Sequence, residues 1–111
     1  MGKDTYGKRL PRAVAQDLKL VGEQIRLARL RRNLSMEQIA DRATCSVPSV
    51  AAVESGKSTV SIGIYIRVLY ALGLHKDILH LAQDDPLGRD LQDLKLPRRQ
   101  RASKSNVSNT D

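Results

Sequence analysis

The chain lacks the large aromatic side chains around which many protein cores are built. It has no tryptophan, no phenylalanine and only three tyrosines in 111 residues. A chain of this length forms one small domain, and its core has to consist of Leu, Ile, Val and Ala. Such residues favour short packed helices over a sandwich or barrel, whose strands are enriched in aromatic residues. We therefore expect an all-α fold.

Cysteines and long apolar runs are also scarce. A single cysteine excludes an internal disulfide and suits a reducing cytoplasm. No apolar run approaches the roughly 20 residues of a membrane-spanning helix, and the N-terminus has no apolar signal core. These absences favour a soluble cytoplasmic protein with no membrane partner.

Positive charge is what the chain has in excess, with a formal net charge of +7. Such a charge favours a polyanionic partner, above all nucleic acid. Residues 1–34 carry nine Lys or Arg against three acidic residues, whereas residues 35–74 carry three of each. The flanks therefore supply the positive field around a neutral centre.

The pattern along the chain predicts three parts. Residues 1–12 mix Gly, Pro and basic residues without periodicity, which is typical of a flexible basic arm. Residues 13–83 are predicted to form a helical domain. Residues 84–111 are predicted to form a partly disordered basic tail, in which 87–96 has the pattern of a marginal amphipathic helix.

Helical periodicity marks the beginning and the end of the domain. From Ala13 to Arg32, apolar residues recur at helical spacing, namely Val14, Leu18, Val21, Ile25, Ala28 and Leu30. A later helix is predicted to begin after Ser61 and to bury Ile62, Tyr65, Ile66, Leu69 and Leu72. Residues 76–82 predict a short fifth helix.

Residues 34–56 predict two short helices separated by a tight turn. Ser35 and Gln38 have the spacing of a capping box. The turn follows at Thr44, and Ser46 is placed to cap the next helix, which Gly56 is expected to end. The expected buried positions are Ile39, Ala40, Ala43, Val50 and Val53. Two helices at this spacing are typical of a DNA-binding helix-turn-helix.

A longer set of residues extends beyond this motif. It comprises Ile25, Arg29, Leu34, Ser35, Glu37, Ile39, Ala40, Val50, Val53, Glu54, Gly56, Lys57, Ala71, Leu72 and Gly73. Through these residues, positions 21–74 resemble the lambda-repressor-like (XRE, Cro-type) helix-turn-helix family. The resemblance implies a five-helix DNA-binding domain that binds a double-stranded DNA operator as a homodimer, in the bacterial cytoplasm at the nucleoid.

Three positions depart from the family pattern. Met36 stands where the family usually has a Gln that contacts DNA, Thr44 where Gly is typical, and Val60 where Pro is usual. None of them breaks the fold, but Met36 removes a polar contact. For Arg29 and Glu54 the resemblance implies a partly buried structural ion pair, in preference to a DNA-binding or catalytic role.

Base-facing side chains are expected mainly on the second helix of the motif. The predicted set is Met36, Val47, Pro48, Ser49, Ala51 and Ala52. Ser49 discriminates poorly between bases, and Val and Ala offer only contacts to thymine methyl groups. We therefore expect sequence to be selected largely through DNA shape, half-site spacing and the basic flanks.

Phosphate contacts are expected from hydroxyl and basic side chains near helix ends. The predicted set is Arg26, Ser35, Ser46, Ser55, Lys57, Ser58 and Thr59, with Lys19 as a further contributor. Each residue taken alone also fits a helix cap or a solvated surface position.

No arrangement of residues predicts catalysis, a cofactor or a metal site. His75 and His80 have no third ligand at metal spacing. Cys45 is expected to be a small buried apolar residue at the turn, since no basic residue or His lies next to it in the sequence to activate the thiol. The chain is therefore expected not to be an enzyme.

Two questions stay open at the level of sequence. The stretch from Asp84 to Arg101 resembles the tail of HipB-type antitoxins, which implies an autoregulatory repressor that also holds a HipA-like toxin kinase. The same stretch also fits a disordered basic tail that adds non-specific DNA affinity. The alternative to a sequence-specific repressor is a protein-interaction or bridging module of the same fold with weak, largely non-specific DNA binding.

Overall fold

The computed structural model describes residues 9–94, and all their regular structure is helical. It consists of α2 (Arg12–Arg31), α3 (Met36–Ala43), α4 (Val47–Glu54), α5 (Ile62–Ala71), the 3-10 helix η1 (His75–His80) and a helix over residues 86–94. The all-α expectation is confirmed for these residues. Residues 1–8 of the expected arm and 95–111 of the expected tail lie outside the described residues.

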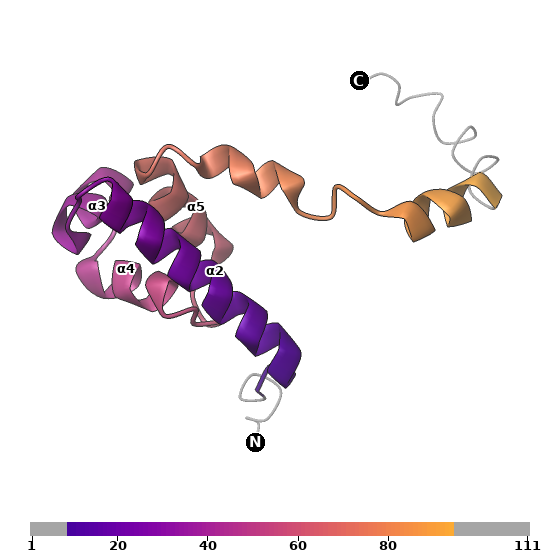
Figure 1. Ribbon diagram of the computed structural model, residues 1–111, viewed down its shortest axis with the longest axis horizontal. Helices are drawn as coiled ribbons and strands as arrows, with labels where there is room; N and C mark the ends of the chain where they lie inside the picture. The colour runs from indigo at the N-terminus through magenta and orange to yellow at the C-terminus, as the bar shows by residue number, and fades with distance from the viewer. Residues whose placement is uncertain (1–8, 95–111) are drawn as a thin grey trace. The chain divides into compact units, whose positions relative to one another are not determined.

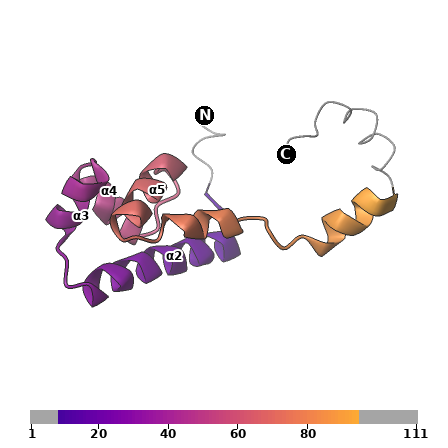
Figure 2. The same ribbon diagram turned by 90° about the horizontal axis from the view of Figure 1, so that it is seen from above.

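The described chain divides into two units, one ending at Ile78 and the other beginning at Leu79. In the first unit, α4 packs against α2, α3 and α5, and α3 also packs against α5. Figures 1 and 2 show α3, α4 and α5 gathered along the later part of α2, while its first turns extend past them. In the second unit, Asp85 accepts a hydrogen bond from the Gly88 N–H at 3.0 Å and so caps the helix over 86–94.

The core of the first unit is wholly aliphatic, as the lack of aromatic residues predicts. Its buried members are Ile25, Ala28, Ile39, Ala40, Ala43, Val50, Val53, Val68 and Leu72. The five positions predicted to be buried in α3 and α4 are confirmed. These two helices are short enough for a few apolar positions to define the buried side.

Burial of individual apolar residues is predicted less accurately in the longer helices α2 and α5 than in α3 and α4. Val14, Val21 and Leu30 are exposed, because the first turns of α2 extend past the core and Leu30 lies on its outer side. Ile62 is 59% exposed, whereas Val68 is fully buried. The expected fifth helix is the 3-10 helix η1, which buries no residue.

Candidate nucleic-acid interface

The two helices α3 and α4 and their turn form a motif whose ends are fixed by local hydrogen bonds. Ser35 Oγ accepts from the Gln38 N–H at 3.0 Å, and Gln38 Oε1 accepts from the Ser35 N–H at 2.8 Å, which completes the predicted capping box. Thr44 adopts a left-handed conformation (φ 56°) in the turn. Ser46 Oγ then accepts from the Ser49 N–H at 3.2 Å and caps α4. These short bonds set where each helix starts.

A buried ion pair ties this motif to α2. Arg29 Nε and Nη2 donate to the two carboxylate oxygens of Glu54 at 2.6 and 3.0 Å. Arg29 Nη1 donates to the Leu34 carbonyl at 2.8 Å, so the same guanidinium also holds the loop before α3. The hydrogen bonds to Glu54 raise the pKa of Arg29 above its ordinary value, which keeps the guanidinium charged. Both residues are less than a tenth exposed, as expected for a structural ion pair.

Two glycines allow α2 and the end of α4 to meet backbone to backbone. A Cβ atom on Gly22 would lie 2.6 Å from the Glu54 carbonyl oxygen and 2.8 Å from the Gly56 nitrogen. Gly56 has φ +72°, and a Cβ atom there would lie 2.7 Å from the Leu18 carbonyl oxygen. This close approach places the loop after α4 directly against α2.

The residues predicted to face the bases differ in how far they reach the surface. Met36 and Val47 are half-buried and pack against the core. On α4, Pro48 is exposed, while Ser49, Ala51 and Ala52 are partly exposed. The hydroxyl groups of Ser49 and Ser46 lie 2.9 Å apart in a mutual hydrogen bond. The outer surface of α4 is therefore small and apolar, with Ser49 as its hydroxyl group.

The predicted phosphate ligands also fall into two groups. Lys57, Ser58 and Thr59 are exposed in the loop after α4. The Ser55 hydroxyl donates back to the Ala52 carbonyl at 3.1 Å, and Arg26 pairs with Glu23 at 3.2 Å on the surface of α2. The exposed side chains of the loop after α4 are therefore more available to a phosphate than Ser55 and Arg26, which already bond within the protein.

Tyr65 holds this loop, a role that sequence reasoning missed. Its hydroxyl donates to the Lys57 carbonyl at 2.9 Å, across the space between α5 and the loop. Partial burial raises the pKa of Tyr65, so the phenol stays protonated and able to donate at neutral pH. The only sequence signal was a tyrosine among aliphatic residues on the core face of this helix.

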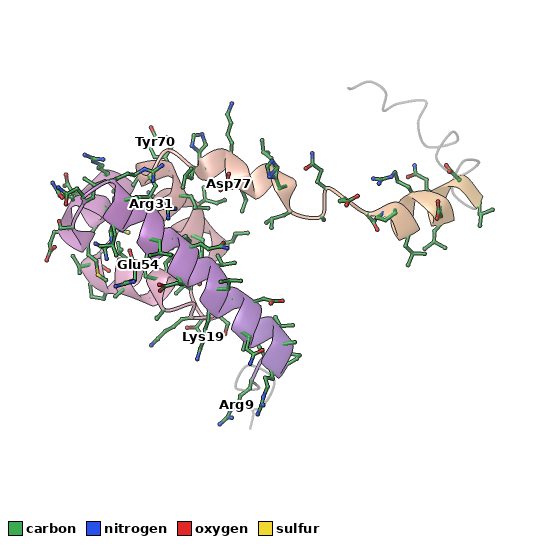
Figure 3. The ribbon with its side chains drawn as sticks, viewed as in Figure 1. Arg9, Lys19, Arg31, Glu54, Tyr70 and Asp77 are labelled. Carbon is green, nitrogen blue, oxygen red and sulfur yellow. The ribbon has the colours of Figure 1, made fainter. Side chains whose placement is uncertain are left out.

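Replacing Tyr65 by phenylalanine is expected to weaken DNA binding several-fold while costing only about 1 kcal/mol of stability. The reason is that one net hydrogen bond contributes about 0.5–1.5 kcal/mol, and its loss frees the backbone that carries Lys57. Anisotropy with labelled duplex DNA and urea unfolding measure the two effects. Tyr70→Phe, at the tyrosine labelled in Figure 3, is the matched control. Tyr70 is 63% exposed. Equal affinity of the Tyr65 and Tyr70 variants would contradict this role.

Cys45 lies half-buried in the turn and packs against the core. Burial raises the pKa of its thiol, although the charge of nearby Arg67 acts in the opposite direction. A neutral thiol is a poor nucleophile, which agrees with the predicted packing role.

Two short capped helices joined by a tight turn, within an all-helical unit, place the protein in the class of helix-turn-helix proteins. Residues 20–81 match the family model described as a helix-turn-helix domain, which is more than half of the chain. The chain belongs to this helix-turn-helix family.

One relative extends this comparison. The chain is 34% identical over 59 residues to the uncharacterized HTH-type transcriptional regulator y4mF of Sinorhizobium fredii (strain NBRC 101917 / NGR234). The aligned region covers 53% of this chain and 78% of that protein. No solved structure matches the chain. Among residues 9–94, no helix has the length and apolar character needed to cross a lipid bilayer.

Proposed function

We propose that the protein is a sequence-specific, double-stranded DNA-binding transcriptional regulator that represses its own promoter in the bacterial cytoplasm. The observation that carries the proposal is the geometry of the motif, in which both helices are capped and the buried Arg29–Glu54 pair fixes them against α2. A preorganised motif of this kind presents α4 to the major groove without an ordering cost at binding. The name of the relative, an HTH-type transcriptional regulator, supports the same function.

In this proposal α4 selects DNA by shape and methyl contacts. Pro48, Ala51 and Ala52 have no side-chain donor or acceptor, and Ser49 contributes a single hydroxyl. A bidentate Arg–guanine or Gln–adenine contact is therefore not available from this helix. Lys57, Ser58 and Thr59 contact the adjacent phosphates and set the position of α4.

Selection of bound sequences from a random duplex pool tests this function. We expect enriched half-sites with thymines and flexible or narrow-groove steps, at a fixed spacing of about one helical turn. Several invariant guanines in each half-site would contradict the proposed readout. Absence of any enrichment would contradict sequence-specific regulation itself.

The bare surface of α4 also favours a second candidate, a protein-interaction or bridging module with weak, non-specific DNA binding. A gel shift on the upstream DNA of its own gene, at two salt concentrations and against random competitor, separates the two. A complex that resists competitor at the higher salt supports the regulator, because purely electrostatic binding declines steeply with salt. If random competitor DNA removes the complex completely at both salt concentrations, the protein-interaction or bridging module is supported.

The proposed repressor acts as a homodimer. Candidate interface residues are Ile78, Leu81, Leu87 and Leu91, of which Leu87 is 68% and Leu91 is 49% exposed on the helix over 86–94. These two leucines lie four residues apart and so share one side of that helix. Association of two copies would bury them.

Combining Leu87→Ala with Leu91→Ala is therefore expected to shift the protein from dimer to monomer and to weaken operator binding by tenfold or more. Loss of buried leucine surface costs about 1.5–3 kcal/mol per side chain. Sedimentation equilibrium measures the mass, and Leu20→Ala, at an exposed leucine of α2, is the control. An unchanged mass and affinity in the double variant would rule out this interface.

The finer proposal is that the protein is the antitoxin partner of a HipA-like toxin kinase. The sequence resemblance of its tail supports this, together with the exposed leucines of the helix over 86–94. Co-purification with the kinase encoded next to it, where one is present, tests the proposal. A HipA-like neighbour that fails to bind the full chain would exclude it.

A further inference from the structure

A groove lies between the start of α2 and the loop after α4, outside the helix-turn-helix motif itself. It has a volume of about 410 Å³, and Arg9, Arg12, Lys19 and Ser58 contribute to its walls. Gly56 forms part of the wall on the loop side. Among the residues that the structure describes, 9–94, none of those lining the groove is acidic.

The positive charge in this groove comes from one side of α2. Arg12, Lys19 and Arg26 are seven residues apart, so they form a row along the helix with a spacing of about 10.5 Å. Arg26 is paired with Glu23, but no ion pair engages Arg12 or Lys19 among residues 9–94. In Figure 3, Lys19 extends from the middle of α2 and Arg9 lies near the beginning of the helix. Arg12 and Lys19, the two side chains of the row without an ion pair among residues 9–94, both line the groove.

The beginning of α2, which lines the groove, is also suited to binding an anion. Pro11 precedes the helix without a side-chain cap, and the first turn contains no acidic residue. The free N–H groups of a 20-residue helix therefore add partial positive charge to that of Arg9 and Arg12. Basic side chains, helix N–H groups and a serine hydroxyl are the donors that DNA phosphates commonly accept from.

We propose that this groove binds a phosphate of the DNA backbone beyond the segment that α4 contacts. The inference rests on the proposed function and adds a second anchoring point to it. The close contact of Gly56 with Leu18 and Lys19 joins the groove to the loop that carries Lys57 and Ser58. One continuous basic surface thereby runs from the loop after α4 to the start of α2, which lengthens the DNA footprint on its outer side.

The salt dependence of binding to a duplex of mixed sequence tests the groove. Each phosphate neutralised by Lys or Arg contributes about 0.9 to the slope of log K against log salt. Because the groove binds one phosphate, combining Arg12→Gln with Lys19→Gln is expected to reduce the slope by about 0.9 per protomer and to weaken binding several-fold at about 0.1 M salt. The base preference obtained by selection is expected to stay unchanged.

Arg31→Gln with Lys76→Gln is the matched control, since it removes the same charge at exposed positions outside the groove. Arg31 lies at the opposite end of α2 from Arg9 (Figure 3). If the Arg12→Gln, Lys19→Gln variant has the same salt slope as the control variant, the proposed phosphate site in the groove is wrong, while the proposed regulator function still stands. A wild-type protein that binds no duplex would overturn both.

A second measurement uses only the wild-type protein and so does not depend on the folding of a variant. Neutral methylphosphonates replace single backbone positions outside the half-site of a selected duplex. Weaker binding of duplexes modified at one or two such positions supports the proposed phosphate site. Equal affinity for all the modified duplexes would show that the proposal is wrong.

Discussion

Replacing Arg29 by alanine is expected to lower the free energy of unfolding by about 3–5 kcal/mol. The substitution removes both donors to the Glu54 carboxylate, which is only 7% exposed and stands at the negative end of α4. It also leaves the Leu34 carbonyl without its guanidinium partner. A unit of this size has roughly 4–10 kcal/mol of stability in total, so the variant is expected to be partly unfolded at 37 °C.

Urea unfolding followed by circular dichroism measures this loss. Arg31→Ala is the control, because Arg31 belongs to the same helix but is exposed, and a change within about 0.5 kcal/mol is expected there. The stability of a double variant, Arg29→Met with Glu54→Met, is expected to exceed that of Arg29→Ala, since no buried charge is left alone. A loss below about 1 kcal/mol for Arg29→Ala would show that the pair does not hold α2 to α4.

The residues that could be predicted from sequence are those whose roles are local. Ser35, Ser46 and Ser61 cap their helices as expected, because a cap depends only on the next few residues. The left-handed Gly56 and Gly73 were predictable for the same reason. Sequence patterns therefore located the helix ends of the motif with good accuracy.

The buried side of a longer helix could not be predicted in the same way. In α5, apolar residues occupy nearly every position, so periodicity does not separate the exposed Ile62 from the buried Val68. In α2, the helical pattern continues from Val14 to Ile25, although the core reaches only the later part. These choices depend on where the neighbouring helices end, which is a property of the tertiary structure.

The same distinction applies to the site. The composition of α4 already predicted a surface poor in hydrogen-bonding groups, because this follows from residue type alone. The groove beside Lys19 joins segments far apart in sequence, and the Tyr65 bond joins a helix to the loop eight residues before it, so neither follows a helical or capping pattern. The close contact at Gly22 is of the same kind, since nothing in the sequence of α2 distinguishes it from a helix-weakening glycine.

Replacing Gly22 by alanine is expected to destabilise the protein by about 2 kcal/mol or more, although alanine is the better helix former. In an exposed helix the substitution would add about 1 kcal/mol of stability. At this position the new methyl group would lie between 2.6 and 2.8 Å from three backbone atoms of residues 53, 54 and 56. Backbone cannot rotate away as a side chain can, so α2 has to separate from the end of α4, at an overpacking cost of about 3 kcal/mol.

Gly63→Ala provides the matched control for this prediction. Gly63 is exposed near the start of α5, where an added Cβ would have only the Ser61 hydroxyl nearby, at 3.7 Å. That variant is expected to be as stable as the wild type or slightly more stable, so opposite signs for the two glycines isolate the backbone contact from helix propensity. Because separation of α2 from α4 also moves Lys19 away from Ser58, the Gly22 variant is expected to lose DNA affinity even at temperatures where it remains folded. A Gly22 variant at least as stable as the wild type would mean that the two backbones do not meet at this point, and the groove beside them would lose its physical basis.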